Sequence, residues 1–502
     1  MDGRGNNRPA VFAASFAFFA IAIAGLVGCS RAGGARDSAE AIEAMPASEV
    51  VLAEPSRDGQ PTATRPSMDL ITRLEMLRKQ GLFDEFVDST LNAASSDAPD
   101  PALQLLKAEA LLAVGRNEDA ESAALRAIQL RADDADPALI GQALKLWTIS
   151  RLREQKPLAD PLLDQQFLFG ASESQIPAVK LLRFWSDGLG LRPAYRLSSA
   201  SSMERSEAEP ASGIAGTISA ELNAIQAGVN GVLFPLVFID SGAQHTLLTA
   251  AAAELAGVNV GPSDVDLVGF AGLKARPGII RKLELGNIVL EDVPVLVGNS
   301  SPLIAAQGQM ALGTELMHHV RFTLDYPRRK VFVAPAGSPP EKSHKENSSR
   351  PAWQIPVWTF SQCLLSQGEM PRGTMARVLI DTGDRAGTFL SHRWAKRNLP
   401  QFQRPTSNLV FKFKPRNLLV DGLQLGNRSL DQWPVLDTIP SELERLDLVD
   451  VLLGHDLLAP YELTIDLRSR VLELRSDAPA LPTPAGPTAE QGAAATNEPK
   501  EG

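Results

Sequence analysis

One motif is written twice in this chain of 502 residues, and it constrains the fold more than any other feature. In each copy an apolar run typical of a buried β-strand ends in Asp, a hydroxyl residue and Gly. The two copies are Asp240-Ser241-Gly242 and Asp381-Thr382-Gly383. Because so short a motif can arise by chance, its weight depends on whether the surrounding sequence repeats as well.

The surrounding sequence does repeat. The two motifs are 141 positions apart, and other landmarks recur at the same or nearly the same offset. These pairs are Gly313 and Gly454, Asp325 and Asp466, and, at an offset of 140, Gly286 and Gly426. The repeat predicts two copies of one module of roughly 110 residues, which is an ordinary domain size. Within it, Asp325 and Asp466 follow strand-like runs, so we expect them to be structural.

A pair of carboxyl groups brought together by such a duplication has a specific chemistry. Two carboxyls that share one site cannot both ionise cheaply, so one keeps a proton while the other stays charged. The charged group can activate water, and the protonated group can polarise a carbonyl. Because the two titrate as a unit, the sequence does not say whether Asp240 or Asp381 is the base. This chemistry needs no cofactor, and the six histidines show no metal-ligand spacing.

Both copies resemble the retropepsin-like and pepsin-like aspartic peptidases, over about half of the chain. The resemblance implies that Asp240 and Asp381 are catalytic and that the hydroxyls of Ser241 and Thr382 hydrogen-bond across to the opposite lobe. It also implies that Gly242 and Gly383 give the backbone freedom for a tight turn. Copy one continues with the small residue Ala243, as the family usually does. Copy two departs from the pattern with Asp384, an additional carboxylate that either alters the dyad or pairs with Arg385 at the surface.

The resemblance further implies a flap, a mobile hairpin that covers the cleft. In copy one the hairpin tip is expected at Gly269, Phe270, Ala271 and Gly272, whose glycines permit movement. The equivalent stretch of copy two, residues 409–415, lacks Gly. We therefore expect one working flap, from copy one.

The N-terminus predicts export. Arg4 and Arg8 precede an apolar run at residues 11–26 that is short for a transmembrane span. The following Leu-Val-Gly-Cys resembles the lipobox of bacterial lipoproteins, which implies lipidation of Cys29; an ordinary uncleaved anchor is the alternative. We expect a lipid-anchored protein of the cell envelope, and Ser30 favours the periplasm-facing outer membrane if the cell is Gram-negative. With Cys29 acylated, Cys363 has no partner for an intramolecular disulfide.

Leucine-rich helical spacing begins near Met68, and two helix-pair patterns place Gly81 and Gly115 34 residues apart. This is the tetratricopeptide (TPR) period, and the residues after Gly115 resemble such a repeat. Two interpretations stay open: a groove for a peptide or protein partner, or a small helical cap packed on the next domain. The formal charge of −10 argues against nucleic acid as a partner.

The expected fold class is multidomain α + β, with an N-terminal α-helical, TPR-like region followed by two mainly-β acid-protease lobes related by internal duplication. The expected divisions are a lipoprotein signal peptide (1–29), a disordered tether (30–67), the helical region (68–197), lobe 1 (214–334), a linker (335–351), lobe 2 (352–476) and a disordered tail (477–502).

The expected function is an exported, membrane-tethered aspartic endopeptidase acting on a peptide or protein substrate. A catalytically inactive module that binds a peptide or partner is the rival. Pairing of each copy with its twin in a second molecule, as in retroviral enzymes of this kind, is a third possibility.

Overall fold

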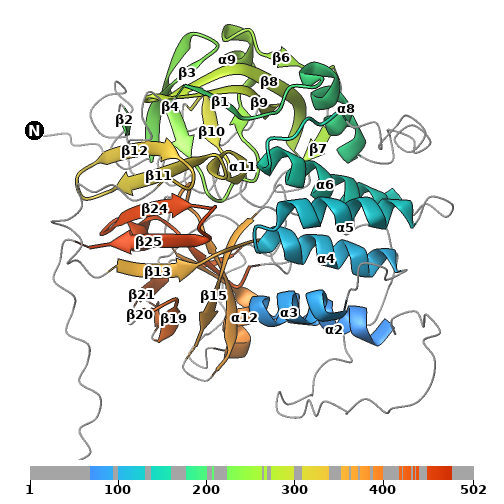
Figure 1. Ribbon diagram of the computed structural model, residues 1–502. Helices are drawn as coiled ribbons and strands as arrows, with labels where there is room; N and C mark the ends of the chain where they lie inside the picture. The colour runs from blue at the N-terminus through green and yellow to red at the C-terminus, as the bar shows by residue number, and fades with distance from the viewer. Residues whose placement is uncertain are drawn as a thin grey trace, which may run out of the picture.

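The structure is a computed structural model, and it describes residues 68–93, 100–130, 137–159, 177–199, 206–208, 223–262, 265–267, 273–298, 308–338, 352–360, 363–370, 373–384, 388–398, 418–420, 422–430, 433–435, 437–439 and 449–476. Helices cover one side of two stacked β-rich lobes, with lobe 1 above lobe 2 in the view of Figure 1. This confirms the expected order of a helical region followed by two mainly-β lobes.

The helical region contains α2 (Met68–Lys79), α3 (Phe83–Ala93), α4 (Pro101–Ala113), α5 (Asn117–Gln129), α6 (Pro137–Arg153) and α8 (Pro177–Leu189). The first four form two helix pairs whose turns have the same geometry. Gly81 and Gly115 both have φ of +77°, a left-handed conformation that suits glycine at a helix end. The next N–H in each turn reaches back into the preceding helix, from Leu82 to Leu77 and from Arg116 to Leu111. The kinship with tetratricopeptide repeats stays a prediction.

Lobe 1 is a closed barrel. Its strands are β1 (Arg196–Ser199), β3 (Ala224–Val229), β4 (Val232–Ile239), β5 (Leu247–Leu248), β6 (Asn259–Val260), β7 (Val265–Leu267), β8 (Leu273–Leu285), β9 (Ile288–Gly298) and β10 (Met310–Leu312), with helices α9 (Ala250–Leu255) and α11 (Thr314–Met317). The direct pairing of the long strands β8 and β9 closes the sheet on itself. Asn230 and Gly231, both with positive φ, make the tight β3–β4 hairpin that their dipeptide predicts.

Lobe 2 repeats the plan as an open sheet. Its strands are β14 (Trp358–Phe360), β15 (Cys363–Glu369), β16 (Met375–Ile380), β17 (Phe389–Ser391), β19 (Leu423–Leu425), β20 (Arg428–Leu430), β22 (Asp437–Ile439) and β23 (Val451–Leu453), with helices α12 (His392–Asn398) and α14 (His455–Leu458) and a small separate pair, β18 (Leu418–Val420) and β21 (Trp433–Val435). Parallel pairing of β16 with β23 matches, residue for residue at the offset of 141, the pairing of β4 with β10.

A third sheet joins the lobes. Its six strands are β13 (Ala352–Pro356), β25 (Val471–Arg475), β24 (Glu462–Asp466), β11 (Val320–Asp325), β12 (Lys330–Pro335) and β2 (Ser206–Ala208), in that order. At its centre β11 of lobe 1 pairs with β24 of lobe 2, and Thr323 lies opposite its own repeat, Thr464, with the two hydroxyl oxygens 3.2 Å apart. The approximate twofold axis of the duplication therefore passes through this pair.

The helical region packs on lobe 2 through aromatic side chains. The fully buried Phe83 of α3 lies against Trp358 and Phe360, with ring centroids 5.5 and 4.6 Å apart. Phe86, one turn further along α3, meets Phe360 edge-on. This face of the helices is thus covered by the neighbouring lobe, as expected of a cap.

A buried charge then ties the helices to both lobes. Arg153 at the end of α6 is 4% exposed and donates to the Glu315 carboxylate of lobe 1 at 3.2 Å and to the Thr359 hydroxyl of lobe 2 at 3.1 Å. Since Glu315 is itself fully buried, neither charge has water to solvate it, and each depends on the other.

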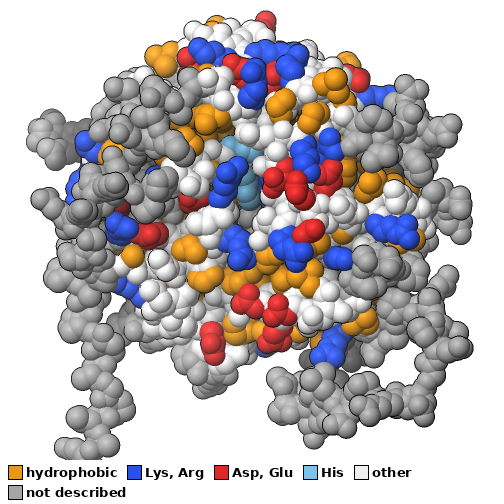
Figure 2. Space-filling view, in the orientation of Figure 1, with side chains coloured by type: hydrophobic (Ala, Val, Ile, Leu, Met, Phe, Trp, Pro, Cys, Tyr) orange, Lys and Arg blue, Asp and Glu red, His pale blue; other side chains and the backbone are white. Residues whose placement is uncertain are grey.

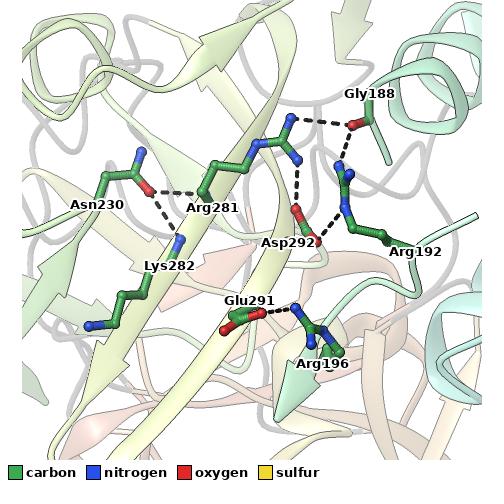
Figure 3. Close-up of polar contacts among 8 residues, drawn as sticks. All are labelled: Gly188, Arg192, Arg196, Asn230, Arg281, Lys282, Glu291 and Asp292. Atoms are coloured by element: carbon green, nitrogen blue, oxygen red, sulfur yellow. Dashed lines mark hydrogen bonds and ion pairs between the residues drawn. The ribbon is translucent and has the colours of Figure 1, made fainter. Parts of the chain in front are cut away.

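Helix α8 is fastened to the barrel by a network of ion pairs that Figure 3 shows. Asp292 of β9 binds two arginines, with Arg192 Nε at 3.0 Å and an Arg281 side-chain nitrogen at 2.6 Å. Both arginines also donate to the carbonyl oxygen of Gly188 in α8. Beside them Arg196 of β1 pairs with Glu291. Strand β1 begins at Arg196, within the region expected to be helical (68–197), and β2 lies between that region and the expected start of lobe 1.

Several expectations concern residues outside the described ranges. These are the signal peptide with Cys29, the tether at 30–67, residues 339–351 of the expected linker and the tail at 477–502. Within the described helices, none has the length and apolar character that crossing a membrane requires.

We expect Phe83→Ala to lower the free energy of unfolding by about 3–5 kcal/mol, because it empties a fully buried ring site between α3 and lobe 2. Urea unfolding followed by circular dichroism measures this. Leu191→Ala, at a side chain 80% exposed, is the control and should change stability by less than about 0.5 kcal/mol. Equal, small effects of both changes would contradict the packing described above.

Candidate active site

The two aspartates lie at equivalent points of the two lobes. Asp240 follows the last residue of β4, and its backbone N–H donates to Leu312 of β10 at 3.0 Å. Asp381 follows β16, and its N–H donates to Leu453 of β23, also at 3.0 Å. Each apolar strand therefore delivers its carboxyl group at a point held by the neighbouring parallel strand.

Four hydrogen bonds lock the two motifs together across the lobe boundary. The N–H of Ser241 donates to the Thr382 hydroxyl at 3.0 Å, and the N–H of Thr382 donates to the Ser241 hydroxyl at 3.0 Å. Each hydroxyl then donates onward to a carbonyl of the opposite strand, Ser241 to Ile380 at 2.7 Å and Thr382 to Ile239 at 2.8 Å. All of these groups are buried, so the arrangement fixes the relative position of the two loops.

Both carboxyl groups are held in the same way. Oδ1 of Asp240 accepts the N–H groups of Gly242 and Ala243, each at 3.0 Å. Oδ1 of Asp381 accepts those of Gly383 at 2.8 Å and Asp384 at 3.1 Å. Within the described part of the chain, Oδ2 of each carboxyl is buried and accepts no other N–H or O–H group, and the two carboxyl groups lie within hydrogen-bonding reach of each other. Each aspartate thus has one oxygen fixed by the loop and one available to a reacting molecule.

The glycines of the motif serve a different purpose from the one expected. Neither Gly242 nor Gly383 has a left-handed φ, so backbone freedom is not what the site requires of them. A Cβ on Gly242 would lie 2.6 Å from the carboxyl carbon of Asp381, and a Cβ on Gly383 would lie 2.6 Å from that of Asp240. Each glycine therefore provides the space in which the carboxyl of the opposite lobe sits.

Burial and mutual repulsion shift the titration of the pair. The pKa of Asp240 is well above its ordinary 3.8, because the group is fully buried and the Asp381 carboxyl faces it. Burial raises the pKa of Asp381 to about 6, against the N–H groups of Gly383 and Asp384, which favour its charged form. Since the two loops are nearly identical, these raised pKa values belong to the pair rather than to either residue alone.

Asp384, the departure from the family pattern, is fully buried, and Arg385 lies outside the described residues. The backbone of Asp384 nevertheless copies that of Ala243. The Ala243 carbonyl accepts the N–H of Thr314 at 2.9 Å, and the Asp384 carbonyl accepts the N–H of His455 at 2.9 Å. The loop geometry is therefore kept, and only the side chain differs, which places a third carboxyl group in the buried surroundings of the dyad.

Three further residues next to the motifs had no signal in the sequence. Asn223, in a left-handed conformation, donates its side-chain N–H to the Thr382 carbonyl. Tyr326 lies close enough to Asp381 for that carboxyl, after burial, to raise the pKa of the phenol. Its ring meets His455 edge-on with centroids 5.1 Å apart. These residues come from three separate segments, so only the fold brings them together.

The remaining expected features are placed only in part. Strands β7 and β8 form the antiparallel base of the expected flap, with Leu267 opposite Leu273. The tip itself (Gly269, Phe270, Ala271 and Gly272) and the stretch at 409–415 lie outside the described residues. Gly313 lies at a close backbone crossing, because a Cβ there would lie 2.5 Å from the His245 carbonyl carbon. No set of three or more potential metal ligands gathers anywhere in the described ranges.

Comparison with known proteins supports the same reading of lobe 1. Residues 225–316 match the model of a family described as aspartyl protease, a stretch that contains the first motif and the Gly313 crossing. A search of the curated proteins found no match. Among solved structures, the chain is similar to an aspartic proteinase from Irpex lacteus, with 10% identity, 54% of this chain and 97% of the other covered, and a TM-score of 0.34.

We expect Thr382→Val to destabilise the protein by about 2–4 kcal/mol, because it strands the buried N–H of Ser241 and the buried carbonyl of Ile239 at once. Chemical denaturation measures the loss. Thr382→Ser is the matched control, since Ser241 already performs the same task in lobe 1, and it should retain most of the stability. If Val and Ser behave alike at this position, the hydroxyl bridge does not hold the lobes.

The dyad should also make stability depend on pH in a predictable direction. Its folded pKa values lie above the unfolded value of 3.8, so above pH 4 the folded protein retains a proton that the unfolded chain has lost. The stabilisation is therefore complete below about pH 4 and decreases as the pH rises through about 6. We expect the wild type to lose more unfolding free energy between pH 4 and pH 7 than the Asp240→Asn, Asp381→Asn double variant.

Comparing these two proteins cancels the contribution of other titrating groups, including the buried histidines. Urea unfolding at several pH values gives both curves. Parallel curves would show that the pair does not bind a proton more tightly in the folded state.

Proposed function

We propose that the protein is an exported, membrane-tethered aspartic endopeptidase in which Asp240 and Asp381 form the catalytic dyad. The observation that carries the proposal is the meeting of two buried carboxyl groups on matching loops, each with one oxygen held by backbone N–H groups and the other accepting no other N–H or O–H group among the described residues. The aspartyl protease match over residues 225–316 supports it independently of the geometry.

The geometry suits addition of water to a peptide bond. The charged carboxylate takes a proton from water, whose oxygen bonds to the carbonyl carbon, while the protonated carboxyl donates a hydrogen bond to the carbonyl oxygen. As the resulting intermediate collapses, the C–N bond breaks and the leaving amine takes a proton. With one proton between the two aspartates, the dyad provides the charged carboxylate and the protonated carboxyl at the same time. No cofactor enters any step.

Both carboxyl groups come from one chain, and this favours a single intramolecular site over a site built from two molecules. The cross-lobe hydrogen bonds of Ser241 and Thr382 already satisfy the groups that a second copy would have to bind. Tethering rests on the Leu-Val-Gly-Cys segment that ends at Cys29, and substrate binding under a flap rests on the β7–β8 hairpin base.

A second candidate is an inactive relative that binds peptides without cutting them. The buried carboxyl of Asp384 favours it, because this additional acidic side chain next to the second motif departs from the loop of lobe 1, which has Ala243 there. The backbone geometry of the loop, which matches that of lobe 1, favours activity instead.

We expect Asp240→Asn and Asp381→Asn each to reduce kcat/KM for peptide cleavage by at least about 1,000-fold, because either change removes the shared proton system. Cleavage of a peptide library by the purified full chain, from pH 3 to pH 8, measures this. Asp325→Asn, at a buried strand-end aspartate bound to Arg328, is the control and should leave kcat unchanged in the folded protein. Peptide binding without cleavage by the wild type would favour the inactive module.

A further inference from the structure

A cavity of about 360 Å³ lies where the helical region meets both lobes. Its walls come from the α4–α5 turn, the end of α6, the residue after α11, strand β14 and the β24–β25 turn. Figure 2 shows histidine side chains recessed on this face at the position of α11 in Figure 1, with lysine or arginine side chains next to them. The cavity is within the size range of small-molecule sites, and it contains neither dyad carboxyl.

Buried polar atoms around this cavity lack partners. His318 is 8% exposed and Arg153 is 4% exposed, and within the described residues His318 Nε2 and Arg153 Nε make no hydrogen bond. Asn117 donates its amide to Glu154 at 2.6 Å, which leaves its Oδ1 as a buried acceptor that is also unpartnered there. Native proteins rarely leave buried polar atoms unsatisfied, so two nitrogens and one oxygen around one space indicate a bound molecule.

The charge around the cavity favours an anion. Glu315 offsets the charge of Arg153, and Glu154 is the one carboxylate among the lining residues. Arg468 and Arg470 add two guanidinium groups to the lining, and Arg470 also interacts electrostatically with the Asp84 carboxyl of α3. Burial, together with Arg153 and Arg468, keeps the pKa of His318 well below its ordinary value, so the ring is neutral and can donate to an oxyanion from one nitrogen.

The internal repeat lacks two of these cavity residues. At the offset of 141, His318 corresponds to Ala459, and Arg468 corresponds to Pro327. Arg470 does have a counterpart, Arg329, in the equivalent turn of lobe 1 with nearly the same φ, 57° against 55°. Arg329 does not line the cavity, so it provides a control in the same local structure.

We propose that this cavity binds the oxyanion group of a small molecule, a carboxylate or a phosphate, that also carries an N–H or O–H donor. Arg468, Arg470 and His318 bind the oxyanion, and Asn117 Oδ1 accepts the neighbouring donor. Guanidinium groups pair well with both carboxylates and phosphates. Binding of one probe of each kind distinguishes the two. The proposal is independent of peptide cleavage, because it involves none of the dyad residues.

Isothermal titration calorimetry on the full chain tests it, with N-acetylglycine and inorganic phosphate as separate probes at constant ionic strength. We expect saturable binding of at least one probe, and N-acetylglycine tighter than acetate because its amide N–H reaches Asn117. Arg470→Gln should weaken binding by at least about tenfold, as loss of a charge-assisted pair predicts, whereas Arg329→Gln should bind as the wild type does.

His318→Gln provides a second, buried variant and should also weaken binding, with folding checked by circular dichroism. Because Arg470 is exposed, the test survives even if this second variant is unstable. Absence of saturable binding of either probe would overturn the proposal. So would equal weakening by Arg470→Gln and Arg329→Gln, since that result indicates general attraction of anions to the surface rather than a site.

Discussion

The reciprocal hydrogen bonds between Ser241 and Thr382 are the interaction on which the rest of the structure depends. They are buried and symmetric, and they join the two strand ends that carry Asp240 and Asp381. With the loops held in this way, each carboxyl occupies the space left by the glycine of the opposite lobe. Burial raises the pKa of both carboxyl groups, and the facing Asp381 carboxyl raises that of Asp240 further. The hydrogen bonds between Ser241 and Thr382 thus fix the positions of the two carboxyl groups, on which both their raised pKa values and the proposed chemistry depend.

The duplication explains why so much of this centre was visible in the sequence. A constant offset of 141 identifies equivalent residues, and the strand pairings of β4 with β10 and of β16 with β23 obey it. It even identifies the pair at the axis, Thr323 and Thr464, once their strands are known to be neighbours. The hairpin at Asn230 was equally predictable, since its dipeptide favours one turn type.

Other parts were not predictable because they depend on contacts between distant segments. Nothing near Asn223 or Tyr326 marks them as neighbours of the second motif. The role of Gly242 was misjudged for a related reason: sequence suggests backbone freedom, whereas the need for space arises only when the opposite carboxyl approaches. Likewise, Asp384 beside an arginine suggests an exposed position, whereas its side chain is fully buried. The strands β1 and β2 are short and acquire their structure from the sheets they join.

The position of Arg153 has a consequence for how this architecture is inherited. One side chain at the end of α6 satisfies a carboxylate in the first lobe and a hydroxyl in the second. Because this charge is enclosed, the helical region cannot be lost without consequence for the lobes. A related protein that lacked it would have Glu315 without its counter-ion. Shuffling of this segment among proteins would have to carry a compensating replacement at Glu315, so the three parts are expected to pass through evolution as one unit.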